Sequence, residues 1–589
     1  MNTTTYTYKA LQIAILCFIS IIFIGCSTAD NTSELHQIFE DFWEYRLETE
    51  PFLATSHGIR SANSKLPDVS LEALTARNEQ MLAFKNRLSQ IDQSNLSQQD
   101  FVSYRLLDRT LSNSIEAFEL GEYVLPLNGW WDYHATIAEL PTNMPFNNTE
   151  DYENYLSRLQ AFPQMNTSYL ERLSMGVERG WVRPKVVLDN YIPTVENLIT
   201  EVEESRFFEP FKSFPQSVTI AERERLQEKA LQIITDSIIP EYEILATYLK
   251  NDYYNAAPEI TGVSEWQGGL EYYEYLVRNF TTTDTTPQEI HQIGLNEVER
   301  IRGEMQQVIL ETGFTRDFDE FVHFLRTDSR FYAQTKDELL KYTSLILKKM
   351  DGELPKYFGR LPRMPYGIRE IPDYLAPRMT TASYSSPAQD GTRAGFYNIN
   401  TYDLPSRPLY EVEALSYHEA VPGHHLQLAL QQELEGIPTF RQNSSFTVFV
   451  EGWALYSEWL ALEMGFYEDP YNNFGRLSYE MWRALRLVVD TGLHAKGWTR
   501  QQAIDFMAEN SALTLLNIRN EVDRYIFWPG QALAYKTGEL KIRELRSIAE
   551  QELGDTFDIR SFHDAVLENG SVTLEVLEEH ILNWIENQR

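Results

Sequence analysis

Apolar residues recur three and four positions apart along most of this chain, which is the spacing typical of amphipathic helices. In the first such segment apolar side chains stand at positions 35, 38, 39, 42 and 43, and Pro51 ends the pattern. The same spacing predicts further helices at residues 71–92, 97–120, 149–172, 220–250, 267–279, 287–312, 336–351, 409–432, 445–465, 472–494, 500–509, 515–527 and 530–552. The pattern therefore predicts a mainly α protein. No period of 20–50 residues repeats, which argues against a solenoid.

Several predicted helices begin with a capping box. In this motif a hydroxyl side chain, and a Glu or Gln three residues later, satisfy free backbone N–H groups at the helix start. The pattern occurs at residues 286–289, 335–338 and 499–502. We expect three helices to begin at these positions.

Residues 353–408 interrupt the helical pattern and are rich in proline. Within them Thr381–Ser385 and Ala394–Asn400 are predicted strands, and Asp390-Gly391 between them is a hairpin signal. An open strand edge pairs with the backbone of an extended peptide without reading its side chains. We therefore interpret this hairpin as a substrate-binding edge. The alternative is an ordinary hairpin that covers a helical core.

Three of the chain's 11 histidines lie within residues 416–427, which read Ser-Tyr-His-Glu-Ala-Val-Pro-Gly-His-His-Leu-Gln. Imidazole and carboxylate groups are common ligands of catalytic zinc, which keeps one position open to water. Glu419 stands beside His418, where it can accept the proton of that water. The cluster therefore predicts a zinc site. The alternative is three histidines near a helix kink that bind no metal.

The spacing of these histidines differs from the usual H-E-x-x-H motif, whose two histidines share one helical face. On an undisturbed helix His418 and His424 point about 120° apart, while His418 and His425 share a face but lie about 10 Å apart. Neither pair would bind one ion on such a helix. A helix bulges or breaks most readily at Pro422-Gly423. A two-residue bulge there would bring His424 back beside His418.

A second acidic motif occupies residues 449–458, on the next predicted helix. Enough chain separates Glu451 from His424 for a turn and a return helix, so Glu451 can reach the same ion. Glu458 lies two helical turns farther along the same face. It is a candidate for orienting a ligating histidine.

The two motifs, HEAVPGHHLQ and EGWALYSE, resemble the bacterial lipoprotein-type family known as domain of unknown function 885. That family is grouped with zinc metallopeptidases of the thimet oligopeptidase and angiotensin-converting enzyme kind. The resemblance covers roughly residues 33–589. It implies a large helical metallopeptidase-like fold with a deep cleft and a small sheet next to the metal helix. It also implies that His418, His424 and Glu451 bind Zn²⁺ and that Glu419 is the general base, with His425 as the alternative second ligand.

Peptide hydrolysis also needs a hydrogen-bond donor for the developing oxyanion. The run from Gly530 to Tyr535 resembles the tyrosine region of thimet oligopeptidase, and Arg524-Tyr525 resembles a pair in angiotensin-converting enzyme. The glycine spacing favours Tyr535, with Tyr525 as the alternative.

His494 is a further catalytic candidate, because it lies at the end of a predicted helix and can donate to substrate. It follows Asp490 by four residues. The alternative is an ion pair between these two side chains on the helix surface.

Composition narrows the function classes. The formal net charge of −35 argues against nucleic acid, which requires a basic face, and against anionic lipid headgroups. The hydrophobic fraction of 43% argues against a disordered chain. We place a seam in the polar stretch 251–265, which divides an N-terminal helical region (27–260) from a C-terminal helical region (261–589) that carries the metal site.

Residues 1–26 are predicted to be a lipoprotein signal peptide. Lys9 precedes the apolar run Ala10–Gly25, which is short for a membrane span. Phe23–Cys26 resembles a lipoprotein signal-peptidase site, so Cys26 would carry a diacylglyceryl anchor. Ser27 after the cysteine favours the outer membrane by resemblance to the bacterial sorting rule, with the protein facing the periplasm or the cell surface. The alternative is an uncleaved anchor helix.

These observations together predict a zinc-dependent metallopeptidase that hydrolyses short peptides. One alternative is a peptide-binding lipoprotein without catalysis, although such a protein has no need of the His418–Glu419 pair. The other is a zinc hydrolase that acts on a different amide or an ester.

Overall fold

The computed structural model describes residues 31–589 except 130–131, 374–375, 377–378 and 390. The predicted signal peptide and Cys26 lie outside the described residues. The first part of the chain forms a helix at residues 31–49, then α2 (Pro51–Ser56), α3 (Leu71–Ser89), α4 (Gln98–Leu120), α5 (Tyr133–Ala138), α6 (Leu140–Asn143), α7 (Thr149–Arg179), α8 (Lys185–Glu196), α9 (Ile220–Ile233), α10 (Ile239–Tyr248) and α11 (Tyr254–Ala256).

The second part of the chain is also mainly helical. It forms α12 (Gly269–Thr281), α13 (Pro287–Glu311), α14 (Phe318–Thr327), α15 (Lys336–Tyr357), α16 (Leu409–Glu419), α17 (His424–Gln432), α18 (Thr439–Gln442), α19 (Thr447–Glu463), α20 (Pro470–Ala495), α21 (Arg500–Asn510), α22 (Leu515–Phe527), α23 (Ala534–Leu553), α24 (Ile559–Leu567) and α25 (Leu574–Gln588). The predicted mainly α class is confirmed. Among the described helices, none is long and apolar enough to cross a membrane.

Several helices escaped the sequence analysis for identifiable reasons. α14 and α24 have 10 and 9 residues, which is shorter than the window of 11–18 residues over which a helical period is read. α8 contains Pro193, a residue that normally ends a helical pattern. The predicted helix over 409–432 is two helices, α16 and α17, with a break between them.

Two of the three predicted capping boxes are complete. Thr286 with Glu289, and Thr499 with Gln502, make both reciprocal hydrogen bonds. At the start of α15 only half of the box forms, because the Glu338 carboxylate accepts from the Gln334 N–H at 2.7 Å instead.

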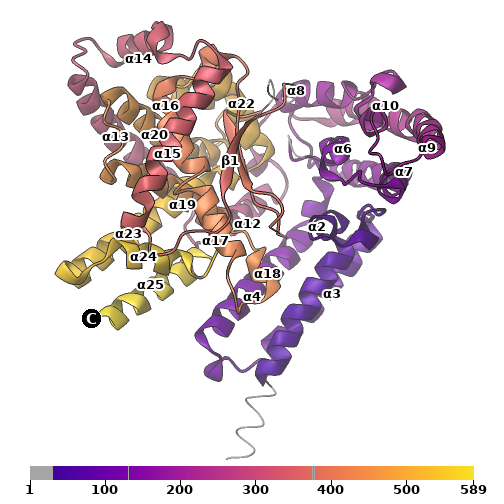
Figure 1. Ribbon diagram of the computed structural model, residues 1–589, viewed down its shortest axis with the longest axis horizontal. Coiled ribbons are helices and arrows are strands. Elements are labelled where there is room, and N and C mark those ends of the chain that lie inside the picture. Colours follow the sequence, from indigo (N-terminus) through magenta and orange to yellow (C-terminus); the bar gives the residue numbers. More distant parts are fainter. Residues whose placement is uncertain (1–30, 130–131, 374–375, 377–378, 390) are drawn as a thin grey trace, which may run out of the picture.

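A three-stranded sheet lies in the predicted proline-rich interruption. Its strand order is β1 (Tyr366–Glu370), β3 (Gly395–Ile399), β2 (Ala382–Ser385). β2 and β3 pair antiparallel, with Tyr384 opposite Tyr397, so the predicted hairpin is confirmed. β1 pairs parallel with β3 and was not predicted, because it is short and follows directly after Pro365. In Figure 1, β1 lies between α7–α10 on the right and α13, α15, α16 and α20 on the left.

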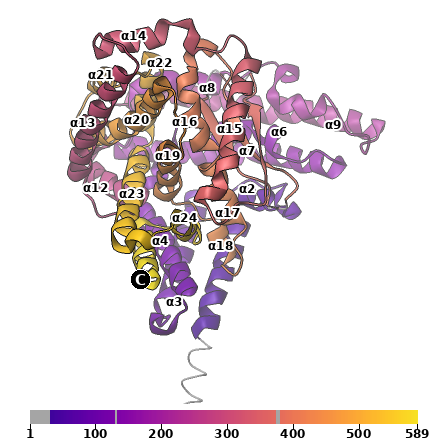
Figure 2. The same ribbon diagram turned by 60° about the vertical axis from the view of Figure 1, so that its left-hand side comes forward.

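Helices α16, α19, α20 and α23 pack against one another and carry most of the predicted site residues (Figure 2). α19 and α23 approach unusually closely at two glycines, since a Cβ on Gly452 would lie 2.6 Å from the Gly538 backbone. This crossing sets Glu451, the neighbour of Gly452, near the first turn of α23, which bears Tyr535.

The main apolar core runs from Leu35 to Ile585 and includes side chains on both sides of the predicted seam at 260 and 261. The division of the chain at that seam remains a prediction.

Candidate metal centre

The break between α16 and α17 brings His418 and His424 together. α16 ends at Glu419, and residues 420–423 form a turn that includes a cis peptide bond before Pro422. The Gly423 N–H donates to the Tyr417 carbonyl at 2.9 Å, and the indole N–H of Trp453 donates to the Pro422 carbonyl at 2.9 Å. A Cβ at position 423 would collide with the His418 carbonyl, so only glycine fits the turn. The turn returns His424 to the same side as His418, and their ring centroids lie 4.7 Å apart.

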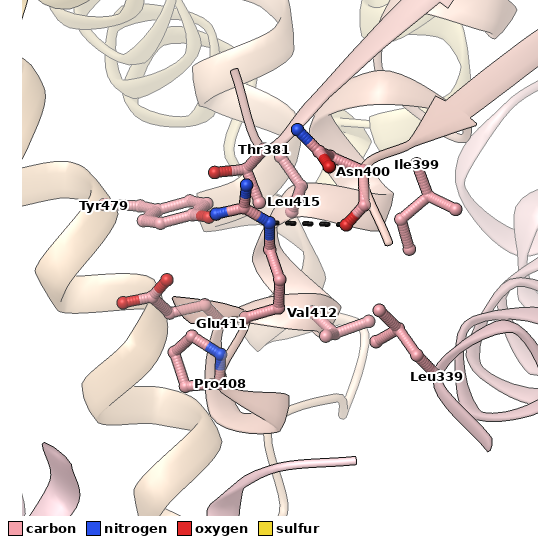
Figure 3. A pocket seen from close by; sticks show the side chains of 10 residues that line it. Leu339, Thr381, Ile399, Asn400, Pro408, Glu411, Val412, Leu415 and Tyr479 are labelled. Carbon is pink, nitrogen blue, oxygen red and sulfur yellow. Dashed lines mark hydrogen bonds between the residues drawn. The ribbon is translucent and has the colours of Figure 1, made fainter. Parts of the chain in front are cut away.

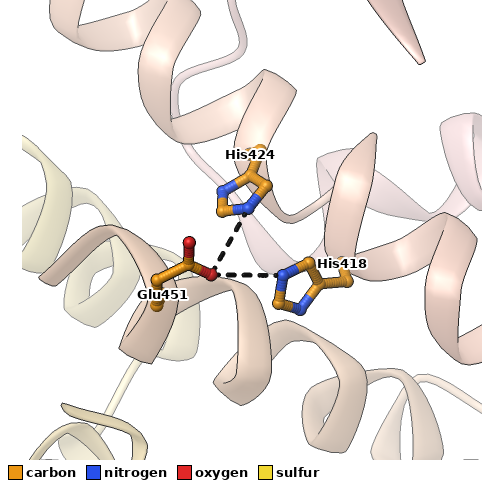
Figure 4. Close-up of side chains that lie close together, drawn as sticks. All are labelled: His418, His424 and Glu451. Carbon is orange, nitrogen blue, oxygen red and sulfur yellow. Dashed lines mark ion pairs between the residues drawn. The ribbon is translucent and has the colours of Figure 1, made fainter. Parts of the chain in front are cut away.

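The three predicted ligands meet at one point (Figure 4). The Glu451 Oε2 atom lies 3.4 Å from His418 Nε2 and 3.6 Å from His424 Nε2, and one ligand atom from each residue falls within 4.8 Å of the other two. Ligands held about 2.1 Å from a tetrahedral zinc ion are separated by about 3.4 Å. The two distances to Glu451 therefore suit ligands that share one ion, and they are long for hydrogen bonds.

Two polar atoms of this cluster lack hydrogen-bond partners. Glu451 Oε2 and His424 Nδ1 are buried and have no hydrogen-bond partner among the described residues. A carboxylate oxygen buried without a partner is costly unless a cation or a donor satisfies it. Two imidazoles and a carboxylate form the ligand set of a catalytic zinc site, so these residues fit a zinc ion.

The electrostatics of the cluster favour positive charge at its centre. Burial lowers the pKa of His418, but the Glu451 and Glu458 carboxylates outweigh it and raise that pKa to about 9. Burial raises the pKa of Glu451, but the imidazoles of His424 and His418 outweigh it and hold that pKa at about 2. Burial lowers the pKa of His424 to about 4, so its ring is neutral and its lone pairs are free. A divalent cation would satisfy the same preference for positive charge.

Glu458 orients His418 from behind, as its sequence position suggested. Its Oε1 atom lies 2.8 Å from His418 Nδ1, which leaves Nε2 to face Glu451. Arg483 Nη2 lies 3.2 Å from the same Glu458 oxygen, and both side chains are almost fully buried. A carboxylate on the far nitrogen of a ligating histidine fixes the tautomer and strengthens the ligand.

Glu419 lies beside the cluster with a free carboxylate. Glu419 is buried, and its carboxylate makes no hydrogen bond or ion pair with any described group. Burial, together with the neighbouring Glu451 and Glu458 carboxylates, outweighs His418 and Arg483 and raises the pKa of Glu419 to about 7. A carboxyl group that titrates near neutral pH can both accept and return a proton.

The structure separates the two candidate tyrosines. The Tyr525 hydroxyl donates to Glu521 at 2.8 Å and accepts from Trp482 at 3.1 Å and Arg486 at 3.0 Å, so its hydrogen-bonding capacity is used. Tyr535 is only partly buried, and its ring lies 4.2 Å from the Arg486 guanidinium carbon. Burial, and then the nearby Glu451 carboxylate, raise the pKa of Tyr535, so its hydroxyl keeps the proton that an oxyanion donor needs.

His494 does not join the cluster, which corrects its prediction as a catalytic residue. It is fully buried within α20, where Nδ1 accepts from the Val263 N–H at 3.3 Å and Nε2 donates to the Tyr525 carbonyl at 3.0 Å. Both ring nitrogens are therefore committed to backbone groups. The alternative surface ion pair is also wrong, because Asp490 is buried and binds the Tyr273 hydroxyl at 2.6 Å and the Gly530 N–H at 3.1 Å.

His425 points away from the cluster and toward the sheet. Its Nδ1 atom accepts from the Tyr384 hydroxyl of β2 at 2.8 Å, and its ring packs on Tyr366 at 4.8 Å. This contact also sets the edge strand β2 next to α17.

A small cavity between the sheet and α16 is unsuited to a substrate. Its volume is about 10 Å³, room for a single water molecule (Figure 3). The Arg407 guanidinium spans it to reach the Asn400 carbonyl at 3.3 Å, and burial raises the pKa of Glu411 in its wall to about 7.

Sequence reasoning missed the arginines of α20 that surround the centre. Arg483 and Arg486 are buried and bind Glu458 and Glu521. The sequence did carry an indication of these arginines. Both stand on a face of α20 that also carries apolar residues, and an arginine on such a face is expected to have a buried acidic partner.

The comparisons with known proteins agree with the fold. Residues 51–581 match the family described as "Bacterial protein of unknown function (DUF885)", and the chain belongs to this family. One similar solved structure is "the putative lipoprotein from Colwellia psychrerythraea", at 28% identity and a TM-score of 0.89, over 95% of this chain and 99% of that one. Another is "a putative lipoprotein of unknown function from Shewanella oneidensis", at 18% identity and a TM-score of 0.74, over 94% and 99% of the two chains. No curated protein sequence matches this chain.

Proposed function

We propose that this protein is a zinc-dependent metallopeptidase that hydrolyses short peptides. The observation that carries the proposal is the buried group of His418, His424 and Glu451, whose ligand atoms converge. Glu451 Oε2 has no hydrogen-bond partner among the described residues, and the free carboxylate of Glu419 lies beside the group. A site that only bound a metal structurally would have four ligands and no base.

The roles of the residues follow from their positions. A zinc ion held by His418, His424 and Glu451 would supply a Lewis acid for the scissile carbonyl and lower the pKa of water. Glu419 takes the proton of the attacking water and passes it to the leaving amine. The Tyr535 hydroxyl donates to the oxyanion. Glu458 and Arg483 hold the His418 ring in its ligating orientation.

The proposed substrate binds as an extended strand against β2, within the cleft expected of a metallopeptidase. β2 is an edge strand of the sheet, and Tyr384 ties it to His425, the neighbour of His424. Strand pairing of this kind forms hydrogen bonds with the peptide backbone and therefore tolerates many different side chains.

We also propose that Cys26 carries a lipid anchor that holds the protein at the outer membrane, outside the cytoplasm. The Cys26 motif, and the description of the similar Colwellia psychrerythraea structure as a "putative lipoprotein", support the lipid anchor. Ser27 after the cysteine is the feature that favours the outer membrane. Replacement of Cys26 by Ser should release the protein from the membrane fraction, because the diacylglyceryl group has no other attachment site. A Cys26→Ser variant that stays membrane-bound and unprocessed would favour an uncleaved anchor helix.

The test of the proposed function joins metal analysis to a peptide digest. The chain from residue 27 onward, purified without chelator, should contain one zinc ion per molecule by mass spectrometry. It should cleave members of a peptide library, lose this activity on dialysis against chelator and regain it with added zinc. Bound zinc without hydrolysis of any peptide, amide or ester would instead favour a binding protein.

A further inference from the structure

Arg486 is a buried arginine near the candidate metal centre that has a donor nitrogen without a partner. Its Nε donates to the Tyr525 hydroxyl at 3.0 Å, and its Nη2 donates to Glu521 at 3.2 Å. Its Nη1 is buried and has no hydrogen-bond partner among the described residues. A charged donor that is buried without a partner is costly, so the structure has capacity here for an acceptor that it does not itself supply.

Among the charged groups in direct contact with this arginine and its neighbour Arg524, positive charge is in excess. Arg524 Nη2 lies 3.0 Å from the same Glu521 oxygen, so two guanidinium groups share one carboxylate. Arg524 also donates a hydrogen bond to a neutral amide, the Gln531 oxygen at 2.7 Å. Asp490 makes no ion pair with either arginine, because its carboxylate accepts hydrogen bonds from the Tyr273 hydroxyl and the Gly530 N–H. In a chain with a net charge of −35, a local excess of positive charge indicates an anionic ligand.

The arginine is held rigidly and within electrostatic range of the metal ligands. Its guanidinium carbon lies 4.5 Å from the Trp482 ring and 4.2 Å from the ring of Tyr535, the proposed oxyanion donor. The charge of Arg486 is also one of the causes that lower the pKa of Glu451. Tyr535, whose ring lies over the guanidinium, is partly exposed.

We propose that Arg486, assisted by Arg524, binds the free C-terminal carboxylate of the peptide substrate, so that the enzyme acts as an exopeptidase at the carboxyl end of peptides. This inference rests on the proposed function and specifies its substrate class. A guanidinium group binds a carboxylate through parallel hydrogen bonds that neither an amide nor an amine can replace. The side-chain carboxylate of an Asp residue offers the same chemistry, and the test below separates the two sources.

The test uses three versions of one short peptide: with a free C-terminus, with an amidated C-terminus, and amidated with Asp as the last residue. Zinc-loaded wild-type protein should hydrolyse the free form with a kcat/KM about 10–100-fold above both amidated forms, the effect of one charged hydrogen-bonded pair. Equal rates on the free and plain amidated forms would overturn the inference. Equal rates on the free form and the Asp amide would overturn the assignment to the C-terminus.

Variants locate the effect. Arg486→Met should abolish the preference for the free C-terminus, while Arg486→Lys, which keeps the charge, should retain part of it. Arg476→Met is the matched control, because Arg476 is also buried on α20 and is paired with a carboxylate, Glu480. In that variant Glu480 would still be paired with Lys536 and Arg300. In the same way, Glu521 would still be paired with Arg524 in Arg486→Met. A preference that persists in Arg486→Met, or that is lost equally in Arg476→Met, would contradict the proposal.

A binding measurement separates this inference from the proposed function. Calorimetry with the zinc-loaded protein should show that the free peptide binds at least tenfold more tightly than its amide, and that Arg486→Met removes this difference. If no peptide is hydrolysed but this difference is found, the peptidase function fails and the carboxylate site stands. If peptides are hydrolysed and bound without regard to amidation, the function stands and the carboxylate site fails.

Discussion

Replacement of His424 by Ala should remove zinc, whereas replacement of the adjacent His425 should not. The two histidines stand side by side in the sequence, but the turn at residues 420–423 sends their rings in different directions. His424 faces Glu451 at 3.6 Å, and His425 is bound to Tyr384 of the sheet. The pair therefore forms a matched comparison in which the same side chain is lost at neighbouring positions.

The expected magnitude follows from the ligand count. Zinc sites with four ligands bind with apparent free energies of about 10–16 kcal/mol, so an equal share for one ligand is about 2.5–4 kcal/mol. The His424→Ala variant should accordingly bind zinc about 10²–10³-fold more weakly. Loss of His425 removes one hydrogen bond to the sheet, worth about 1 kcal/mol of folding stability, and should change zinc affinity by less than about tenfold.

The assay is equilibrium competition with a zinc chelator of known affinity, with circular dichroism as the check on folding. Zinc retained in His424→Ala and lost in His425→Ala would refute the assignment and make His425 the ligand. Loss of zinc from both variants with intact helical content would mean that both imidazoles bind the ion.

Further predictions concern the surroundings of the centre. Glu458→Gln should weaken zinc binding about 10–100-fold, because the His418 ring loses its charged partner; unchanged affinity in chelator competition would contradict this role. Tyr535→Phe should keep zinc and lower kcat about 10²–10³-fold, whereas Tyr525→Phe should mainly lower the unfolding temperature; the reverse result would exchange their roles. Burial raises the pKa of Asp490 from 3.8 to about 7. Between these two pH values the Asp490 carboxyl group is therefore protonated in the folded protein and ionised in the unfolded chain. Wild-type stability should therefore fall relative to Asp490→Asn as pH rises from 4 to 8, by up to a few kcal/mol, and urea unfolding that shows a constant difference would contradict the raised pKa.

The sequence predicted the convergence of His418, His424 and Glu451 better than it predicted their surroundings, for physical reasons. His418, Glu419, His424 and Glu451 lie in two short motifs whose residue types suit zinc chemistry, and proline with glycine marked the turn that joins the histidines. The helical periodicity of the long amphipathic segments was likewise visible without a structure.

Contacts between distant segments were not predictable in the same way. Whether Arg486 faces Glu521 depends on how α20 packs against α22, and β1 is defined by its pairing with β3 about thirty residues later. His494 shows the converse error. Its residue type suits catalysis, but its two backbone partners, from Val263 and Tyr525, are visible only in the folded chain.

The central claim is that the protein hydrolyses peptides at a zinc ion with Glu419 as the general base. The most direct test measures peptide hydrolysis by the Glu419→Gln variant, with the zinc content determined on the same sample. The amide is nearly isosteric with the carboxylate but cannot accept the proton of water. We predict full zinc occupancy and a loss of peptide hydrolysis by several orders of magnitude relative to the wild type. A zinc-loaded variant that hydrolyses peptides at the wild-type rate would contradict the claim.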